Sequence, residues 1–260
     1  MRDQLARHPS ETWGYAPDSL YHDRWTLLED HLPNDPFVVV DWGSDAGWFS
    51  VRIAGSHPHS SVVSVEAGIM TGGRGLAEHR SRLEEFGIVN NIVVESLFGP
   101  STFERLWTVP SDYQLVLSVF HHMGDGFGKY LKTPAEWDNA FCDLIRGSNV
   151  TFFEVPNENS PTETPHRVRS WYHGRDVETV ITEALARHQV RASVELLGET
   201  RHGSKGTRKM FKISLDEPVA TVSAEEIADH IRMAAASSQI RNYRRFRIMV
   251  SQLREMLRRV

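Results

Sequence analysis

The sequence predicts an α/β fold built on a mostly parallel sheet, and three observations support this prediction. Short runs of β-branched and aromatic residues occur at 37–41 and 62–66, and a helix-like segment at 47–56 separates them. A glycine-containing turn follows the first run directly. Buried strands that alternate with helices are typical of parallel sheets, because each connecting helix covers one face of the sheet.

The other elements follow from the same patterns. Apolar residues near helical spacing predict an entry helix at 20–32, before the first strand. Further helices are predicted at 75–87, 134–146 and 177–188, and further strands at 91–96, 114–120, 150–155, 190–197 and 208–215. The last two strands could pair as an antiparallel hairpin. Residues 157–170 are polar and contain proline, so they predict a loop.

The C-terminal segment predicts a long helix, because no glycine or proline interrupts residues 222–260. Ser223 and Glu226 have the spacing of a capping box, and residues 240–260 hold seven arginines and one glutamate. We therefore divide the chain into an α/β domain at 1–218 and a basic amphipathic helix at 219–260. This helix could pack on the domain, form a coiled coil in an oligomer, or contact an anionic membrane surface. Because the apolar pattern stops in the middle of a repeat, we also expect that the helix once continued or continues in a longer parent protein.

The composition excludes several classes of protein. A formal net charge of -5 argues against a strongly basic nucleic-acid-binding protein. The single cysteine, Cys142, excludes an internal disulfide framework and is expected to be buried in a helix. No apolar run approaches the ~20 residues that span a membrane, and the N-terminus has no signal-peptide core. A cytoplasmic protein is expected, with peripheral contact at the inner membrane surface left open.

The turn after the first strand is the strongest candidate for a ligand site. Asp41 ends that strand, and Gly43 and Gly47 flank Asp45. A backbone that passes close to a ligand favours residues without a bulky Cβ, and aspartate tolerates a left-handed conformation. Glu66 ends the second strand, where its carboxylate can accept hydrogen bonds from ribose hydroxyls. An ordinary turn beside a surface glutamate is the alternative.

Three segments resemble one family. VVDWGSDAGWFS and VVSVE are similar to the first two motifs of class I S-adenosylmethionine (SAM)-dependent methyltransferases, and DYQLVLSVFHHM is similar to their fourth strand. Asp45 stands at the middle glycine of the first motif, as in a branch that includes sugar- and phosphate-directed methyltransferases. The resemblance covers about 37–156 and runs weakly to about 215. It implies a Rossmann-like class I methyltransferase sheet with helices on both faces, and SAM as the cofactor.

The resemblance also implies a set of cofactor-binding residues at the ends of the first four strands. They are Asp41, Gly43, Ser44, Asp45, Gly47, Trp48, Phe49, Glu66, Ala67, Ser96, Leu97, Ser118 and Val119. The aspartate at the middle glycine argues against a dinucleotide dehydrogenase, because a pyrophosphate needs the close backbone approach that glycine permits.

Methyl transfer to a weakly acidic hydroxyl requires a base. His121 and His122 follow the fourth strand, and imidazole has a suitable pKa range for proton removal at neutral pH. Glu154 ends the fifth strand and could serve as the base or orient a sugar hydroxyl. A purely structural role stays open for each of the three. No motif of metal ligands occurs, so a metal-independent site is expected.

Arg169, Trp171 and His173 are candidates for substrate binding, because aromatic rings stack on sugars and guanidinium groups bind phosphate. A partly solvated lid without a role in chemistry is the alternative. We therefore expect a SAM-dependent methyltransferase that acts on a hydroxyl or phosphate of a saccharide or glycoconjugate, with a small or lipid-linked acceptor left open. An RNA or natural-product methyltransferase stays open. So does a non-catalytic SAM-binding scaffold that self-associates through its C-terminal helix.

Overall fold

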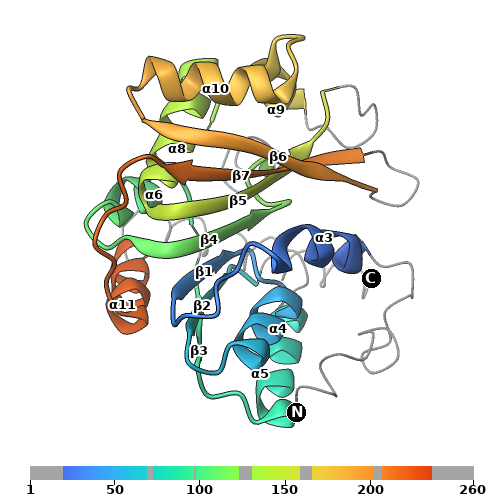
Figure 1. Cartoon of the computed structure of the whole chain (residues 1–260), viewed down its shortest axis with the longest axis vertical. Coiled ribbons are helices and arrows are strands. Elements are labelled where there is room, and N and C mark those ends of the chain that lie inside the picture. Colours follow the sequence, from blue (N-terminus) through green and yellow to red (C-terminus); the bar gives the residue numbers. More distant parts are fainter. Residues whose placement is uncertain are drawn as a thin grey trace, which may run out of the picture.

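The computed structural model describes residues 20–68, 73–96, 98–122, 131–158, 166–201 and 207–235 (Figure 1). A seven-stranded sheet lies at its centre, in the order β3-β2-β1-β4-β5-β7-β6. The strands are β1 (Val38–Trp42), β2 (Ser61–Glu66), β3 (Asn91–Glu95), β4 (Ser111–Leu117), β5 (Ser148–Pro156), β6 (Ala192–Arg201) and β7 (Thr207–Leu215).

The first five strands of the chain run parallel, and β7 enters antiparallel between β5 and β6. This arrangement confirms both the parallel sheet and the hairpin that the sequence predicts. It also brings the carboxyl ends of β1, β2, β4 and β5 to one edge of the sheet. In parallel α/β sheets, ligands bind beyond that edge.

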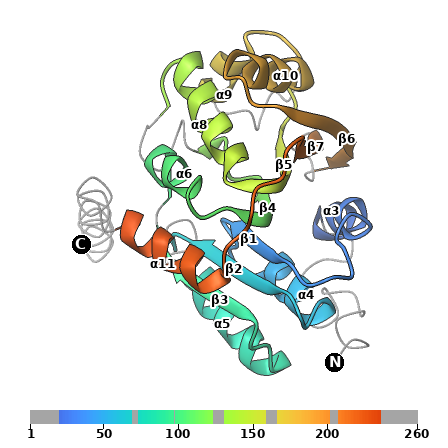
Figure 2. The ribbon, with the colours of Figure 1, turned by 60° about the vertical axis from the view of Figure 1, so that its left-hand side comes forward.

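Helices cover both faces of the sheet, as predicted (Figure 2). They are α3 (Leu20–Glu29), α4 (Trp48–Ser56), α5 (Arg74–Phe86), α6 (Pro100–Leu106), α8 (Pro134–Arg146), α9 (His166–Tyr172), α10 (Val177–Arg187) and α11 (Ala224–Ala235). Val39 and Val62 share one hydrophobic cluster with residues of α3 and α4. Their neighbours Val40 and Val63 share another with α6, α8, α9, α10 and α11.

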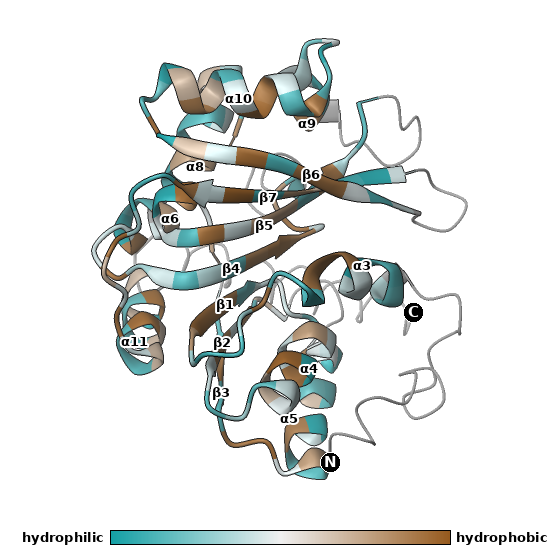
Figure 3. Cartoon of the chain, in the orientation of Figure 1, coloured by the Kyte–Doolittle hydropathy of each residue, from teal (hydrophilic) through white to brown (hydrophobic). Residues whose placement is uncertain are grey.

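This alternation follows from strand geometry, because successive side chains point to opposite faces of a sheet. Both faces of the central strands are apolar, and Figure 3 shows hydrophobic segments along these strands and on the helices beside them. A strand that is buried on both faces needs a continuous apolar run rather than an alternating one.

Two helices differ from the sequence predictions. α6 was not predicted, because it has only seven residues and begins at a proline. Its buried Phe103 and Leu106, three residues apart, were the available signal. α9 begins inside the segment predicted as a loop at 157–170, and Val168 and Trp171 bury its inner face. In both cases burial against the sheet overrides weak local propensity.

The described part of the C-terminal segment packs on the α/β domain. Ser223 and Glu226 form the predicted capping box: the Glu226 N–H donates to Ser223 Oγ at 3.2 Å, and the Ser223 N–H donates to Glu226 Oε2 at 3.1 Å. Ile227 and Ile231 of α11 are fully buried in the cluster that contains α6. Residues 236–260 lie outside the described residues, and with them the proposed coiled coil and membrane contact. Within the described residues, no helix is both long and apolar enough to cross a membrane.

Cys142 is buried in α8, as predicted. Its Sγ lies 3.5 Å from the carbonyl oxygen of Ala184 in α10. Burial raises the pKa of the Cys142 thiol to about 12. The thiol is therefore a neutral packing group between two helices.

Candidate functional site

The turn from Gly43 to Gly47 connects β1 to α4 at the carboxyl edge of the sheet. Gly43, Asp45 and Gly47 have left-handed backbone angles, with φ values of 70°, 47° and 77°. The predicted tolerance of Asp45 for this conformation is thus confirmed. The N–H groups of Gly43 and Ser44 donate to the carbonyl oxygen of Val65 at 2.8 and 3.1 Å. These bonds hold the turn against the end of β2.

The two glycines are required for a reason that the sequence analysis did not supply. A Cβ on Gly43 would lie 2.8 Å from Cγ2 of Val119, which follows β4. A Cβ on Gly47 would lie 2.2 Å from Cδ2 of His79 in α5. Side chains of the protein therefore occupy the space beside both glycines. Close packing within the chain explains these positions without reference to a ligand.

Glu66 lies at the tip of β2, directly beside the turn. Its carboxylate accepts hydrogen bonds from the N–H groups of Asp45 at 2.9 Å and Gly68 at 2.8 Å. Burial raises the pKa of this carboxyl group, and the hydrogen bonds oppose that rise. A carboxylate has several lone pairs, so these backbone donors leave acceptor capacity for hydroxyl groups. This geometry fits the ribose of an adenosine.

Asp41 supports the turn from below. It is 3% exposed and accepts a hydrogen bond from the Ser50 hydroxyl in α4 at 2.5 Å. Burial raises the pKa of Asp41 to about 7, and the negative charge of Glu66 adds to the rise. Asp41 therefore joins the end of β1 to the first turn of α4 through this hydrogen bond.

Two residues of α5 pack behind the turn, and sequence reasoning missed both. The His79 ring is fully buried, with Nδ1 3.5 Å from Ser44 Oγ. Arg82 donates to the Ala46 carbonyl oxygen and pairs with Glu78. The available signal was helical spacing, because His79 and Arg82 recur with apolar residues on the inward face of α5.

The other predicted cofactor residues fall into two groups. Ala67 and Ser96 lie beside Glu66, and the Ser96 N–H donates to the Glu66 carbonyl oxygen at 3.0 Å. Trp48 and Phe49 instead pack their rings on Tyr21 of α3, with centroids 5.5 and 6.0 Å from it. Their side chains therefore belong to the core between α3 and α4. Leu97 lies outside the described residues.

His121 and His122 follow the residue that touches Gly43. The His122 N–H donates to the Val119 carbonyl oxygen at 3.1 Å, and the two imidazole centroids are 4.1 Å apart. His121 is 2% exposed, whereas His122 is half-buried. Of the two, His122 is the more accessible to an acceptor at this edge. Its role as a base remains a proposal.

Glu154 lies at the centre of a buried polar cluster. Its side chain is 0% exposed, and Arg24 of α3 binds it through Nε at 2.9 Å and Nη2 at 2.7 Å. The Ser118 hydroxyl donates to it at 2.6 Å, and the Thr200 hydroxyl at 2.8 Å. Arg208 Nη1 lies 3.9 Å from the same carboxylate. Side chains from α3, from the end of β4 and from β6 and β7 thus surround the Glu154 carboxylate of β5.

This environment opposes the use of Glu154 as a base. Burial alone would raise its pKa, but the charges of Arg24 and Arg208 and the Ser118 hydroxyl bring the pKa below its ordinary value. A carboxylate with a lowered pKa is a poor proton acceptor near neutral pH. The geometry favours the structural ion pair, the alternative that the sequence left open. Sequence reasoning missed Arg24, Thr200 and Arg208, because only the sheet topology brings them together.

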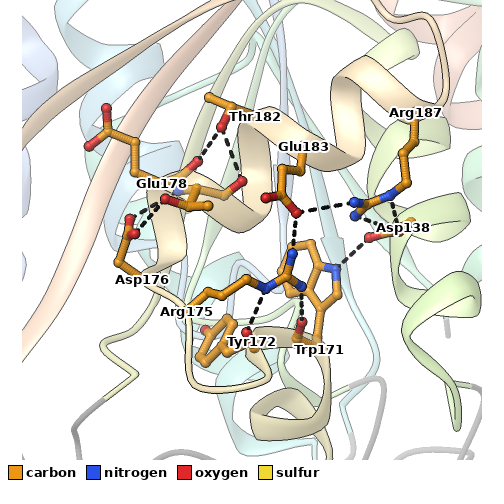
Figure 4. Close-up of polar contacts among 10 residues, drawn as sticks. Asp138, Trp171, Tyr172, Arg175, Asp176, Glu178, Thr182, Glu183 and Arg187 are labelled. Atoms are coloured by element: carbon orange, nitrogen blue, oxygen red, sulfur yellow. Dashed lines mark hydrogen bonds and ion pairs between the residues drawn. The ribbon is translucent and has the colours of Figure 1, made fainter.

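The structure corrects one predicted substrate-binding residue. Trp171 is fully buried and stacks on Trp137 with ring centroids 5.9 Å apart. It donates its indole N–H to Asp138 at 2.8 Å (Figure 4). It therefore belongs to the core beneath α9 and cannot stack on a sugar there. Arg169 and His173 are exposed, so both remain candidates. Within the described part of the chain, no group of three His, Cys, Asp or Glu side chains could hold a metal ion.

No family model and no curated protein matches the chain. Solved structures of WbdD share its architecture. One complex of WbdD with a kinase inhibitor has a TM-score of 0.59 and 20% identity, and the match covers 81% of this chain and 44% of that one. A structure described as the bifunctional kinase-methyltransferase WbdD has a TM-score of 0.55 and 18% identity, over 83% and 44% of the two chains. The chain has the class I methyltransferase fold.

This fold agrees with the strand order and the antiparallel β7. A third WbdD structure matches with a TM-score of 0.54 and 17% identity, over 87% of this chain and 55% of that one. The chain thus spans about half the length of the WbdD chains that it matches. At these identities the likeness establishes the fold and leaves the reaction to the site.

Proposed function

We propose that this chain is a SAM-dependent methyltransferase that modifies an oxygen of a saccharide or glycoconjugate. One observation carries the cofactor assignment. The left-handed turn at 43–47 and the Glu66 carboxylate meet at the carboxyl edge of β1 and β2, and ligands of parallel α/β sheets bind beyond that edge. SAM would supply an electrophilic methyl group at this site.

Different residues of the chain would bind the cofactor and accept the proton. Glu66 would hold the ribose hydroxyls, and the turn from Gly43 to Gly47 would hold the amino-acid part of the cofactor. Val119, which contacts the Gly43 position, would border the cofactor on the β4 side. His122 follows at the same edge and would accept a proton from an acceptor hydroxyl.

The choice of a saccharide acceptor is supported by the Asp45 motif and by the exposed residues Arg169 of α9 and His173 directly after it. RNA and small natural products remain alternative acceptors. A scaffold that binds SAM without turnover is the alternative outside enzyme chemistry.

The first experiment is transfer of labelled methyl from SAM into a host lysate that is then separated into glycan-lipid, RNA, protein and small-molecule pools. Label in the glycan-lipid pool that is lost with Glu66→Ala would support the proposal. Label in the RNA or small-molecule pool would replace the acceptor class. If SAM binds but no pool is labelled, the scaffold alternative is favoured.

The control is Glu225→Ala, a change at an exposed acidic residue in the first turn of α11, remote from the turn. SAM binding by calorimetry should weaken at least tenfold in Glu66→Ala, because two charge-assisted hydrogen bonds are lost. It should not change in the control. Equal SAM binding by both variants would contradict the placement of the ribose on Glu66.

A further inference from the structure

The polar cluster around Glu154 lies at the carboxyl ends of β4 and β5, the same edge of the sheet as the turn from Gly43 to Gly47. Ser118 belongs to this cluster and directly precedes Val119, the residue against Gly43. The strand residues of the cluster lie directly after β4 and on β5, β6 and β7. The turn instead follows β1, and Glu66 ends β2. It therefore flanks the cofactor position rather than forming part of it.

The cluster presents hydrogen-bond donors. Arg24 Nη2 and Arg208 Nη1 both donate to Ser118 Oγ, and Ser118 in turn donates to Glu154. Arg24 uses Nε and Nη2 in its contacts, and Nη1 has no acceptor among the described residues. A guanidinium fork with an unused amino group is suited to an oxyanion.

The exposed fractions of these side chains also favour the arginines as the groups that contact a ligand. The side chains of Arg24 and Arg208 keep 5% and 6% of their surface exposed, whereas Glu154 keeps none. The accessible surface of these three side chains therefore belongs to the arginines. Glu154 lies behind them and fixes the orientation of the Arg24 guanidinium.

We propose that Arg24, supported by Glu154, Ser118 and Arg208, binds an anionic oxygen group of the acceptor, either a phosphate or a carboxylate. This inference rests on the proposed function and narrows its acceptor class from any sugar hydroxyl to an acidic glycoconjugate. Arg24 would thus have two roles. It would bind the acceptor, and its ion pair with Glu154 holds α3 against β5. The lowered pKa of Glu154 agrees, because the carboxylate keeps its charge and holds the arginine throughout the neutral pH range.

The test measures the binding of inorganic phosphate and of acetate to the full chain saturated with S-adenosylhomocysteine. Isothermal calorimetry at constant ionic strength, with sodium chloride as the reference salt, gives both affinities. We expect saturable binding of at least one of the two anions. The tighter of the two identifies the acceptor's group as phosphate or carboxylate.

The variants separate binding from folding. Arg24→Gln alone would leave the Glu154 charge with only the more distant Arg208, so the double variant Arg24→Gln/Glu154→Gln is the main one. We expect it to fold, by circular dichroism, and to bind the anion roughly 10- to 100-fold more weakly. Arg187→Gln is the control, since Arg187 pairs with the buried Asp138 at 2.9 Å on the other face of the sheet. It should bind the anion as the wild type does.

Three results would overturn the inference. They are no saturable binding of either anion, undiminished binding by the folded double variant, and competition between phosphate and SAM, which would assign the arginines to the cofactor's own carboxylate. SAM affinity is measured in the same preparations. Normal SAM affinity without anion binding would reject only this inference, whereas absence of SAM binding would reject the proposed function itself.

Discussion

The imidazole of His79 occupies the space that a side chain on residue 47 would need. A Cβ placed on Gly47 would lie 2.2 Å from His79 Cδ2, far inside van der Waals contact. The same ring lies 3.5 Å from the Ser44 hydroxyl at its Nδ1. Helix α5 therefore fixes the shape of the turn between β1 and α4, and residues remote from any ligand determine the geometry of the site.

The first prediction concerns this contact. Gly47→Ala should destabilise the protein by about 2 to 5 kcal/mol, because it combines a left-handed backbone with overpacking. In Gly47→Ala/His79→Ala the overpacking is removed, and only the backbone cost of about 1 to 2 kcal/mol should remain, apart from the loss caused by His79→Ala alone. Urea unfolding of the wild type, both single variants and the double variant gives the coupling. Additive effects would contradict the close contact.

The second prediction concerns the ion pair of Arg24 and Glu154. Arg24→Gln should cost about 3 to 5 kcal/mol of stability, because a buried carboxylate loses its main partner. Arg24→Gln/Glu154→Gln should be more stable than Arg24→Gln, since the buried carboxylate that lost its main partner is also removed. Urea unfolding at pH 7 measures both. A double variant that is less stable than the single variant would show that the pair matters through packing instead.

The third prediction concerns acid unfolding. The folded-state pKa of Glu154 lies below its ordinary value of 4.5, so the group stabilises the folded protein above that pH. This contribution should decline as the pH falls below about 4.5 and through the lower folded-state pKa. Arg24→Gln/Glu154→Gln should lose less stability than the wild type between pH 5 and pH 3, two values chosen to bracket about 4.5. Parallel pH profiles would contradict the assignment.

The fourth prediction concerns Asp41, whose contribution to stability changes with pH in the opposite direction to that of Glu154. Burial raises its pKa from an ordinary 3.8 to about 7, so the folded protein binds a proton that the unfolded chain releases. The contribution of Asp41 to the free energy of unfolding should therefore fall as the pH rises from about 4 through about 7, as should that of Glu66, whose pKa is also raised. Buried His79, whose pKa is lowered to about 4, contributes with the opposite sign over part of this range. Asp41→Asn should therefore make the slope of stability against pH more positive than in the wild type. Thermal unfolding across this range, with an unchanged slope in Asp41→Asn, would refute the prediction.

The fifth prediction concerns Cys142. Burial raises the pKa of its thiol to about 12, and the thiolate is the reactive form. The native protein should therefore react with a thiol reagent at pH 8 at least about 100-fold more slowly than the urea-unfolded chain. A colorimetric thiol assay with and without urea measures the ratio. Rapid reaction in the native state would show that Cys142 is exposed by local opening.

The sequence was sufficient for the sheet and for the position of the turn. The strands of a parallel sheet are buried on both faces. Residues Val38 to Val40 and Val62 to Val65 are therefore mostly apolar, and this pattern is visible without coordinates. The left-handed conformation of Asp45 could also be predicted, because few residue types tolerate it. Trp171 was misassigned, because an aromatic residue beside basic ones looks the same in a sequence whether its ring is exposed or buried.

Local patterns of spacing and residue type thus determined the fold, the candidate nucleoside-binding edge and the candidate acid at Glu66. Tertiary structure alone decided which long-range neighbours these residues have. His79 of α5 contacts Gly47 in the turn after β1, and Arg24 contacts Glu154, 130 positions later in the sequence. Helical spacing places His79 on the inward face of α5, but no sequence pattern names the partner in either contact, because each depends on how helices dock on the sheet. The charge balance and pKa of a buried group follow from such neighbours, so the chemistry of the site required the folded structure.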